Sequence, residues 1–87
     1  MPDILIYTAT NCQYSKRAKK FLRRNQVNFV EKDVSKNGDF LEEMIEKTGK
    51  ALVPIIDIGD DILIGFDEQV KRDLREKLSL KRKKLKS

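Results

Sequence analysis

The chain has 87 residues, of which 39% are hydrophobic, one is cysteine and none is histidine. This length allows one domain with a small core, and a single cysteine excludes an internal disulfide. One copy of the chain cannot build a zinc or iron–sulfur site from its own thiols and imidazoles. No signal-peptide pattern and no apolar run of about 18 residues is present, so we expect a cytoplasmic protein without a membrane partner.

The net charge of +5 comes from the C-terminal end of the chain. Of the 19 basic residues, five fall within residues 81–87, and the other 14 balance the 14 acidic residues. We therefore predict a neutral domain at residues 1–80 and a basic tail at residues 81–87. Such a run can bind nucleic acid or an anionic surface, but a solvated helix end is the simpler interpretation, so we do not expect a nucleic-acid partner.

Apolar periodicity predicts three elements in the first part of the chain. Residues 4–7 form a short apolar run typical of a buried strand, and residues 27–33 predict a second strand. Between them, residues 13–25 predict a helix with cations on its outer faces. The apolar residues of this helix fall at helical spacing on one face: Tyr14, Ala18, Phe21 and Leu22.

A second helix is expected after Gly38, with Asp39 as its N-cap and Gly49 as its stop. Its apolar side carries Phe40, Leu41, Met44, Ile45 and Thr48. The next stretch, residues 51–58, is apolar like a central strand but contains Pro54. Proline cannot donate a ladder hydrogen bond, so this strand assignment conflicts with its own sequence.

The last part of the chain predicts a hairpin and a closing helix. Residues 59–61 read as the turn, residues 62–64 as the returning strand, and Asp67 as the N-cap of the helix. The inward-facing residues of that helix are expected to be Val70, Leu74 and Leu78. The order βαβ–αββα predicts an α/β fold, a four-stranded mixed sheet with helices on both faces.

Cys12 falls where the first strand has ended and the first helix begins. The free backbone N–H groups and the positive dipole end of a helix start favour thiolate over thiol. Its neighbours Asn11, Gln13 and Ser15 are polar, which favours an accessible sulfur over a buried, inert one. The placement alone therefore predicts a reactive cysteine.

Three separated segments, in this order along the chain, resemble the glutaredoxin family of the thioredoxin superfamily over residues 3–78. They are residues 7–15 with Cys12-Gln13-Tyr14-Ser15, residues 48–54 ending in Val53-Pro54, and residues 64–67, Ile64-Gly65-Phe66-Asp67. The resemblance implies a thioredoxin-like fold and a cis peptide bond before Pro54, facing the thiol. An edge-strand proline is the alternative that the residues alone allow.

The resemblance also implies the catalytic residues, Cys12 and Ser15. Since Ser15 cannot close a disulfide with Cys12, the mechanism it implies is monothiol, with glutathione as co-substrate and no tightly bound cofactor. Ser15 is expected to donate a hydrogen bond to the thiolate. Capping the helix N-terminus is its simpler role, and the two roles are compatible. If Ser15 replaces a native cysteine or selenocysteine, the mechanism would instead be dithiol.

Glutathione-binding residues are carried over from the family onto the matching positions, with no metal ligand among them: Tyr14, Lys50, Val53, Pro54, Phe66 and Asp67. The family lysine three residues before the cysteine is Ala9 here. Lys50 either compensates for that missing charge or is a solvated loop cation.

Two alternatives remain open beside glutathione-dependent thiol–disulfide exchange. One is a [2Fe–2S] carrier that forms a glutathione-ligated dimer, although Gln13-Tyr14 is bulkier than the Gly-Phe usual there. The other is a redox-dead thioredoxin-fold binding module that docks through its basic tail. If the protein catalyses thiol–disulfide exchange, we expect a monomer that acts on glutathione and on glutathionylated or disulfide-bearing proteins.

Overall fold

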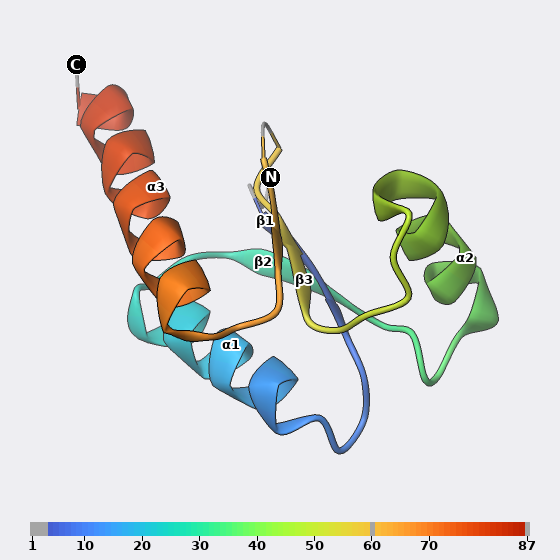
Figure 1. Ribbon diagram of the computed structural model, residues 1–87. Coiled ribbons are helices and arrows are strands. Elements are labelled where there is room, and N and C mark those ends of the chain that lie inside the picture. The colour runs from blue at the N-terminus through green and yellow to red at the C-terminus, as the bar shows by residue number, and fades with distance from the viewer. Residues whose placement is uncertain (1–3, 60, 87) are drawn as a thin grey trace.

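The computed structural model describes residues 4–59 and 61–86. Three helices and four strands follow one another as β1 (Ile4–Thr8), α1 (Gln13–Arg24), β2 (Phe29–Asp33), α2 (Gly38–Thr48), β3 (Ile55–Asp57), β4 (Ile62–Ile64) and α3 (Glu68–Lys86). The strands form one sheet in the order β2-β1-β3-β4. In Figure 1, α1 and α3 lie on one side of this sheet and α2 on the other.

The sheet is mixed, and its register brings the ends of β1 and β2 level with the start of β3. β1 and β2 are parallel, and Thr8 pairs with Asp33 where both strands end. β3 runs antiparallel to β1 with Tyr7 opposite Ile55, and β4 runs antiparallel to β3 with Ile64 also opposite Ile55. The predicted α/β fold, a four-stranded mixed sheet with helices on both faces, is confirmed.

The larger core lies between the sheet and the pair α1 and α3. Its buried members come from the sheet, from α1 and α3 and from the segments next to the strands: Ile4, Ile6, Ala18, Phe21, Leu22, Ile56, Ile58, Leu63, Phe66, Leu74 and Leu78. Val70 is partly buried against this cluster, so the predicted inward face of the last helix is confirmed. Burial of these aliphatic and aromatic side chains supplies most of the hydrophobic stabilisation of so short a chain.

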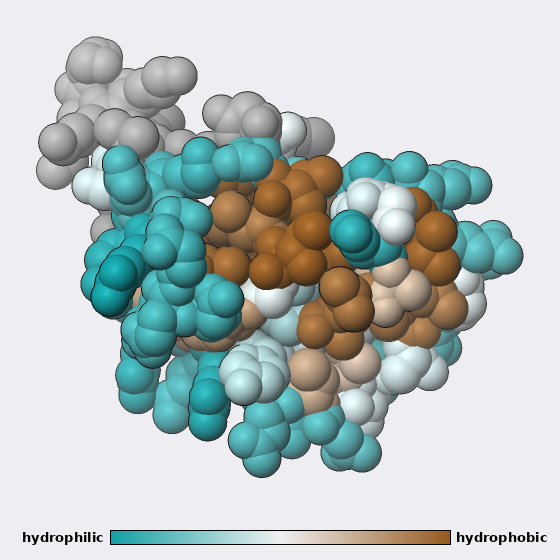
Figure 2. All heavy atoms as spheres, viewed as in Figure 1, coloured by the Kyte–Doolittle hydropathy of each residue, from teal (hydrophilic) through white to brown (hydrophobic). Residues whose placement is uncertain are grey.

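A smaller core lies under α2 and has three buried members, Tyr7, Met44 and Ile55. α2 is also attached to the sheet by polar contacts. The Tyr7 hydroxyl donates to the Glu43 carboxylate, which pairs with Lys32 at 2.7 Å. Because one helix covers this face, Ile64 stays 40% exposed, and Figure 2 shows hydrophobic side chains gathered over the sheet between α2 and α3.

The helix ends follow local backbone chemistry, with one correction. The N-cap of α2 is Asn37, not Asp39, because the Asn37 side chain accepts a hydrogen bond from the Asp39 N–H at 2.9 Å. Asp39 instead lies in the first turn, where a carboxylate suits the helix dipole. Gly49 ends the helix at φ 70°, and Asp67 caps α3 by accepting from the Val70 N–H at 2.9 Å, both as predicted.

Two strands are shorter than their apolar runs. β2 begins at Phe29 rather than at residue 27, and β3 covers Ile55–Asp57 rather than residues 51–58. Pro54 therefore lies just before β3, where no ladder N–H is required of it, and the conflict in the sequence disappears.

The buried face of α1 keeps three of its four predicted residues. Ala18, Phe21 and Leu22 are buried, whereas Tyr14 is 54% exposed. Ser15 is buried in its place, and with Ala18 and Leu22 it has the spacing i, i+3, i+7 of a regular helical face. The prediction that Tyr14 belongs to this face is wrong, and a small polar residue takes the inward position.

The last helix continues through the basic run. The backbone of α3 is helical to Lys86, while the side chains from residue 80 onward lie outside the described part of the chain. The division between a domain at residues 1–80 and a tail at residues 81–87 stays a prediction. Of the helices in the described ranges, none is both long enough and apolar enough to span a bilayer.

Candidate active site

Cys12 is the N-cap residue of α1, as the sequence predicts. Its backbone is extended, its carbonyl oxygen accepts from the Lys16 N–H at 3.1 Å, and its own N–H donates to the Ala9 oxygen at 3.3 Å. The thiol is half-buried and unbridged. An N-cap side chain faces the unpaired N–H groups of the first turn, so the sulfur lies where negative charge is favoured.

The pKa of the Cys12 thiol is lowered by the first turn of α1. Partial burial raises the pKa, but hydrogen bonds from the Ser15 hydroxyl and from the Ser15 and Tyr14 N–H groups lower it by more. These donors interact with the charged form of the sulfur, which is how hydrogen bonding depresses an acid's pKa. The structure thus favours the nucleophilic thiolate.

Ser15 is buried to 1% exposure beneath the thiol. Among the described residues its hydroxyl has no partner that meets full hydrogen-bond geometry, although its interaction with Cys12 lowers the thiol pKa. A buried hydroxyl without a partner is costly, so we assign its proton to the Cys12 sulfur. The simpler role of helix capping is wrong, since Cys12 is the N-cap and Ser15 is the third helical residue.

Replacing Ser15 with alanine is expected to raise the pKa of Cys12, because the thiolate loses its side-chain donor. Alkylation by iodoacetamide, followed as a function of pH, should shift its midpoint upward and slow severalfold at neutral pH. Gln13→Ala is the matched control, since Gln13 is an exposed polar residue of the same turn. Identical profiles for Ser15→Ala and the wild type would show that the hydroxyl does not act on the sulfur.

Pro54 lies at the same end of the sheet as the thiol. The Val53–Pro54 peptide bond is cis. Since Tyr7 is opposite Ile55, Pro54 is level with the end of β1, from which the loop runs to Cys12. Pro54 is buried and its oxygen accepts from the Gly65 N–H at 2.7 Å, while Val53 is half-buried.

The N-terminus of α3 reaches this end as well, because β4 ends at Ile64, opposite Ile55, and Phe66 and Asp67 follow after Gly65. The Phe66 side chain is 9% exposed and its ring lies 5.7 Å from that of Phe21. Phe66 is therefore a core residue. The Asp67 carboxylate is exposed, but it already accepts a hydrogen bond from the Val70 N–H as the cap of α3.

The other two predicted glutathione residues lie at the surface. Tyr14 is exposed on the first turn of α1, with the Arg17 guanidinium 5.6 Å from its ring. Lys50 is exposed in the connection between α2 and β3, and its backbone N–H donates to the Thr48 hydroxyl at 3.1 Å. The fold thus brings Cys12, Pro54 and the start of α3 to one end of the sheet, with Tyr14 beside the thiol along the helix.

Three polar residues that the sequence did not single out hold the loop before Cys12 against the end of β2. The Thr10 hydroxyl donates to Asp33 at 2.9 Å, and the Thr10 N–H donates to the Ser35 oxygen at 3.0 Å. The Ser35 N–H and hydroxyl both donate to Asp33. We call Thr10, Asp33 and Ser35 the loop clasp; the hydrogen bond from Ser35 is the main reason that the pKa of Asp33 is lowered.

Asp33→Ala is expected to lower the free energy of unfolding by about 1–2 kcal/mol, because the clasp loses its common acceptor. Since the folded pKa of Asp33 is depressed below its ordinary value of 3.8, this stabilisation is complete above that pH. The difference in free energy of unfolding between Asp33→Ala and the wild type should therefore become smaller as the pH falls below 3.8. Urea titrations across this range test it. Glu42→Ala, at an exposed position, is the charge-matched control and should have little effect.

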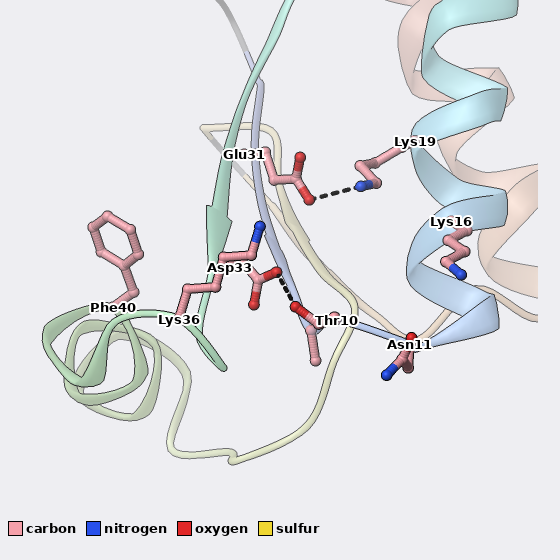
Figure 3. A pocket seen from close by; sticks show the side chains of 9 residues that line it. Thr10, Asn11, Lys16, Lys19, Glu31, Asp33, Lys36 and Phe40 are labelled. Atoms are coloured by element: carbon pink, nitrogen blue, oxygen red, sulfur yellow. Dashed lines mark hydrogen bonds and ion pairs between the residues drawn. The ribbon is translucent and has the colours of Figure 1, made fainter.

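A pocket of about 490 Å³ opens beside the clasp, on the β2 side of the thiol loop. Its lining comes from the thiol loop, α1, β2, the connection from β2 to α2, and α2 itself: Ala9, Thr10, Asn11, Lys16, Lys19, Glu31, Asp33, Lys36 and Phe40. Figure 3 shows Lys19 pointing toward Glu31 and the Thr10 hydroxyl toward Asp33, with Lys16 on the neighbouring turn of α1. Within residues 4–59 and 61–86, no group of three or more His, Cys, Asp or Glu side chains could hold a metal ion.

Comparison with known proteins identifies relatives over most of the chain. The glutaredoxin family model matches residues 4–63. Glutaredoxin 3 of Escherichia coli K12 is 36% identical over 75 residues, which cover 86% of this chain and 90% of that protein. Two solved glutaredoxins share the fold. That of Archaeoglobus fulgidus is 26% identical with a TM-score of 0.76, covering 87% of this chain and 85% of its own. That of Brucella melitensis is 34% identical with a TM-score of 0.67, covering 94% and 87%.

Proposed function

This chain belongs to the glutaredoxin family, a branch of the thioredoxin superfamily, and on that premise we propose that it reduces glutathione mixed disulfides by a monothiol mechanism. Homology supports a thiol–disulfide oxidoreductase. The observation that carries the monothiol proposal is the pairing of a thiol of lowered pKa with a buried hydroxyl at the second position of the motif. Ser15 can donate a hydrogen bond but cannot form a disulfide.

The reaction proceeds through two thiol–disulfide exchanges. The Cys12 thiolate attacks the glutathionyl sulfur of a protein–glutathione mixed disulfide, forming a Cys12–glutathione disulfide and releasing the protein thiolate. The thiolate of a second glutathione then attacks the glutathione sulfur on Cys12. Oxidised glutathione leaves and the Cys12 thiolate is regenerated, so glutathione is the only reductant consumed.

The glutathionyl group is proposed to lie between the Val53–Pro54 segment and the start of α3. The backbone of Val53 would pair with the cysteinyl residue in the manner of an added strand. The γ-glutamyl carboxylate would meet the N–H groups at Phe66 and Asp67, where a helix N-terminus favours an anion. Tyr14 would flank the sulfur, and Lys50 is the cation nearest in sequence to this segment for the glycyl carboxylate.

We expect the protein to act as a cytoplasmic monomer on glutathionylated or disulfide-bearing proteins, with glutathione as co-substrate and no tightly bound cofactor. The reducing supply of glutathione that the second exchange needs is typical of the cytosol. Size-exclusion chromatography of the reduced protein, with and without glutathione, tests the prediction that the protein is a monomer.

The intact mass of the reduced protein after mixing with oxidised glutathione tests the proposal directly. One glutathionyl adduct should form on Cys12 and disappear when excess reduced glutathione is added. Cys12→Ser is the control and should form no adduct. A wild-type protein that stays unmodified under these conditions would contradict the proposed function.

A further inference from the structure

We propose that the pocket beside the loop clasp binds an acidic side chain of the protein substrate, close to the cysteine that carries glutathione. This inference rests on the proposed function, because it assigns the two halves of the mixed disulfide to different sides of Cys12. It adds a substrate preference: glutathionylated cysteines with neighbouring Glu or Asp are reduced fastest.

The sheet order separates the two sides. β1, which leads to the thiol, has β3 on one side and β2 on the other. Pro54 and the start of α3 lie towards β3 and β4, while the pocket lies towards β2. A thiolate attacks a disulfide in line with the S–S bond, so the leaving protein sulfur lies on the far side of the glutathionyl sulfur from Cys12. With the glutathione chain on the β3 side, the β2 side is the side left open to the protein residues around that sulfur.

The charges in the pocket favour an anion. Glu31 is neutralised by Lys19 at 2.8 Å and also accepts from the Thr8 hydroxyl at 2.7 Å. Asp33 is occupied by the hydroxyls of Thr10 and Ser35. Both pocket carboxylates are thus already engaged within the fold.

Two lysines complete the electrostatic balance. Lys36 is exposed and lies near enough to Asp33 to help lower the pKa of that carboxyl. Lys16 is exposed and makes no ion pair with any described residue. With Lys19, the pocket holds three lysines against two carboxylates, and Lys16 lies one turn of helix beyond the thiol.

The remaining lining suits a side chain with an apolar stem and a polar end. Phe40 from α2 is half-buried and forms an apolar wall. Asn11, the residue before the thiol, adopts φ 66°, a left-handed conformation that asparagine tolerates, and its exposed amide lines the pocket. A glutamate at the Asn11 end of the pocket offers its carboxylate to the amide and to Lys16.

The test compares two glutathionylated peptides that differ only in having Glu or Gln on both sides of the cysteine. The wild type should reduce the Glu peptide with a kcat/KM about fivefold higher, the range expected for two exposed ion pairs. The preference should fall as salt is added. In the double variant Lys16→Gln, Lys36→Gln it should disappear, with turnover of the Gln peptide and the KM for glutathione unchanged.

Lys20→Gln is the matched control, since Lys20 is exposed on α1 and does not line the pocket. Equal rates for both peptides, or a preference that survives in the double variant or is lost in Lys20→Gln, would overturn the proposal. A raised KM for glutathione with both peptides would do so too, by assigning the pocket to glutathione.

A second measurement separates this inference from the proposed function. Absence of turnover with either peptide would refute the activity alone. A Glu-rich peptide without cysteine, titrated into the protein and followed by amide chemical shifts, should still perturb Thr10, Asn11 and Lys36. No perturbation there would overturn the pocket whatever the activity.

Discussion

Cys12→Ser is expected to reduce the turnover of a glutathionylated protein to the rate of glutathione alone. Serine keeps the size and the N-cap position of Cys12 but offers no thiolate at neutral pH, and the thiolate is the nucleophile in disulfide exchange. Enzymatic accelerations are commonly about a millionfold or more, so the loss should exceed the effect of any other single change in the protein. Release of the protein thiol, followed in excess glutathione, measures it.

Two comparisons show whether the loss of turnover comes from the missing thiolate or from a loss of folding. Because serine is a good N-cap, the free energy of unfolding of Cys12→Ser should stay within about 0.5 kcal/mol of the wild type. Ser15→Ala should slow turnover only severalfold and keep it well above the glutathione rate, since it removes a donor and not the nucleophile. Turnover by Cys12→Ser above the glutathione rate would contradict the monothiol mechanism.

Leu74→Ala is expected to lower the free energy of unfolding by about 2–5 kcal/mol, the largest stability effect of the substitutions considered. Leu74 is fully buried in the larger core and attaches α3 to the sheet. Truncation removes buried methyl groups and leaves a cavity, in a chain whose total stability is expected to be only about 5–13 kcal/mol. Urea denaturation followed by circular dichroism gives the change.

Leu52→Ala is the matched control, because the Leu52 side chain is 55% exposed. Its free energy of unfolding should stay within about 0.5 kcal/mol of the wild type. If Leu74→Ala is too unstable to study, Leu74→Met keeps the volume and should cost less than about 1.5 kcal/mol. A small effect of Leu74→Ala, equal to that of Leu52→Ala, would show that α3 does not depend on the larger core.

The order of elements was predictable because each carries a local signal. Asp67 caps α3 and Gly49 ends α2 through bonds that these residue types make almost anywhere. One position of the α1 face was misassigned for the opposite reason. Tyr14 is large and apolar in part, so periodicity included it in the face, whereas the buried residue of that turn is Ser15, whose polar side chain gives no apolar signal.

The candidate site was predictable only where residues adjacent in sequence form it. Cys12 lies at a helix start that is formed by consecutive residues, Cys12 to Ser15, so the sequence alone indicates its position. The loop clasp joins Thr10 to Asp33 and Ser35, more than 20 residues away, through hydroxyls and a carboxylate that have no distinctive spacing. The pocket likewise depends on β1 and β2 ending side by side, which lets Lys36 and Lys16, 20 residues apart in sequence, line the same pocket.

The unequal cores on the two faces of the sheet have a consequence for motion. α2 buries a single residue, Met44, and is otherwise attached by ion pairs such as Lys32–Glu43 and Lys47–Asp57. Its amides should therefore exchange with deuterium through local opening well before those of α1, and faster as salt weakens those pairs. Phe40, one wall of the pocket, would move with α2 while the thiol stays fixed on α1, so the pocket could adjust to substrates of different shape without disturbing the reactive sulfur.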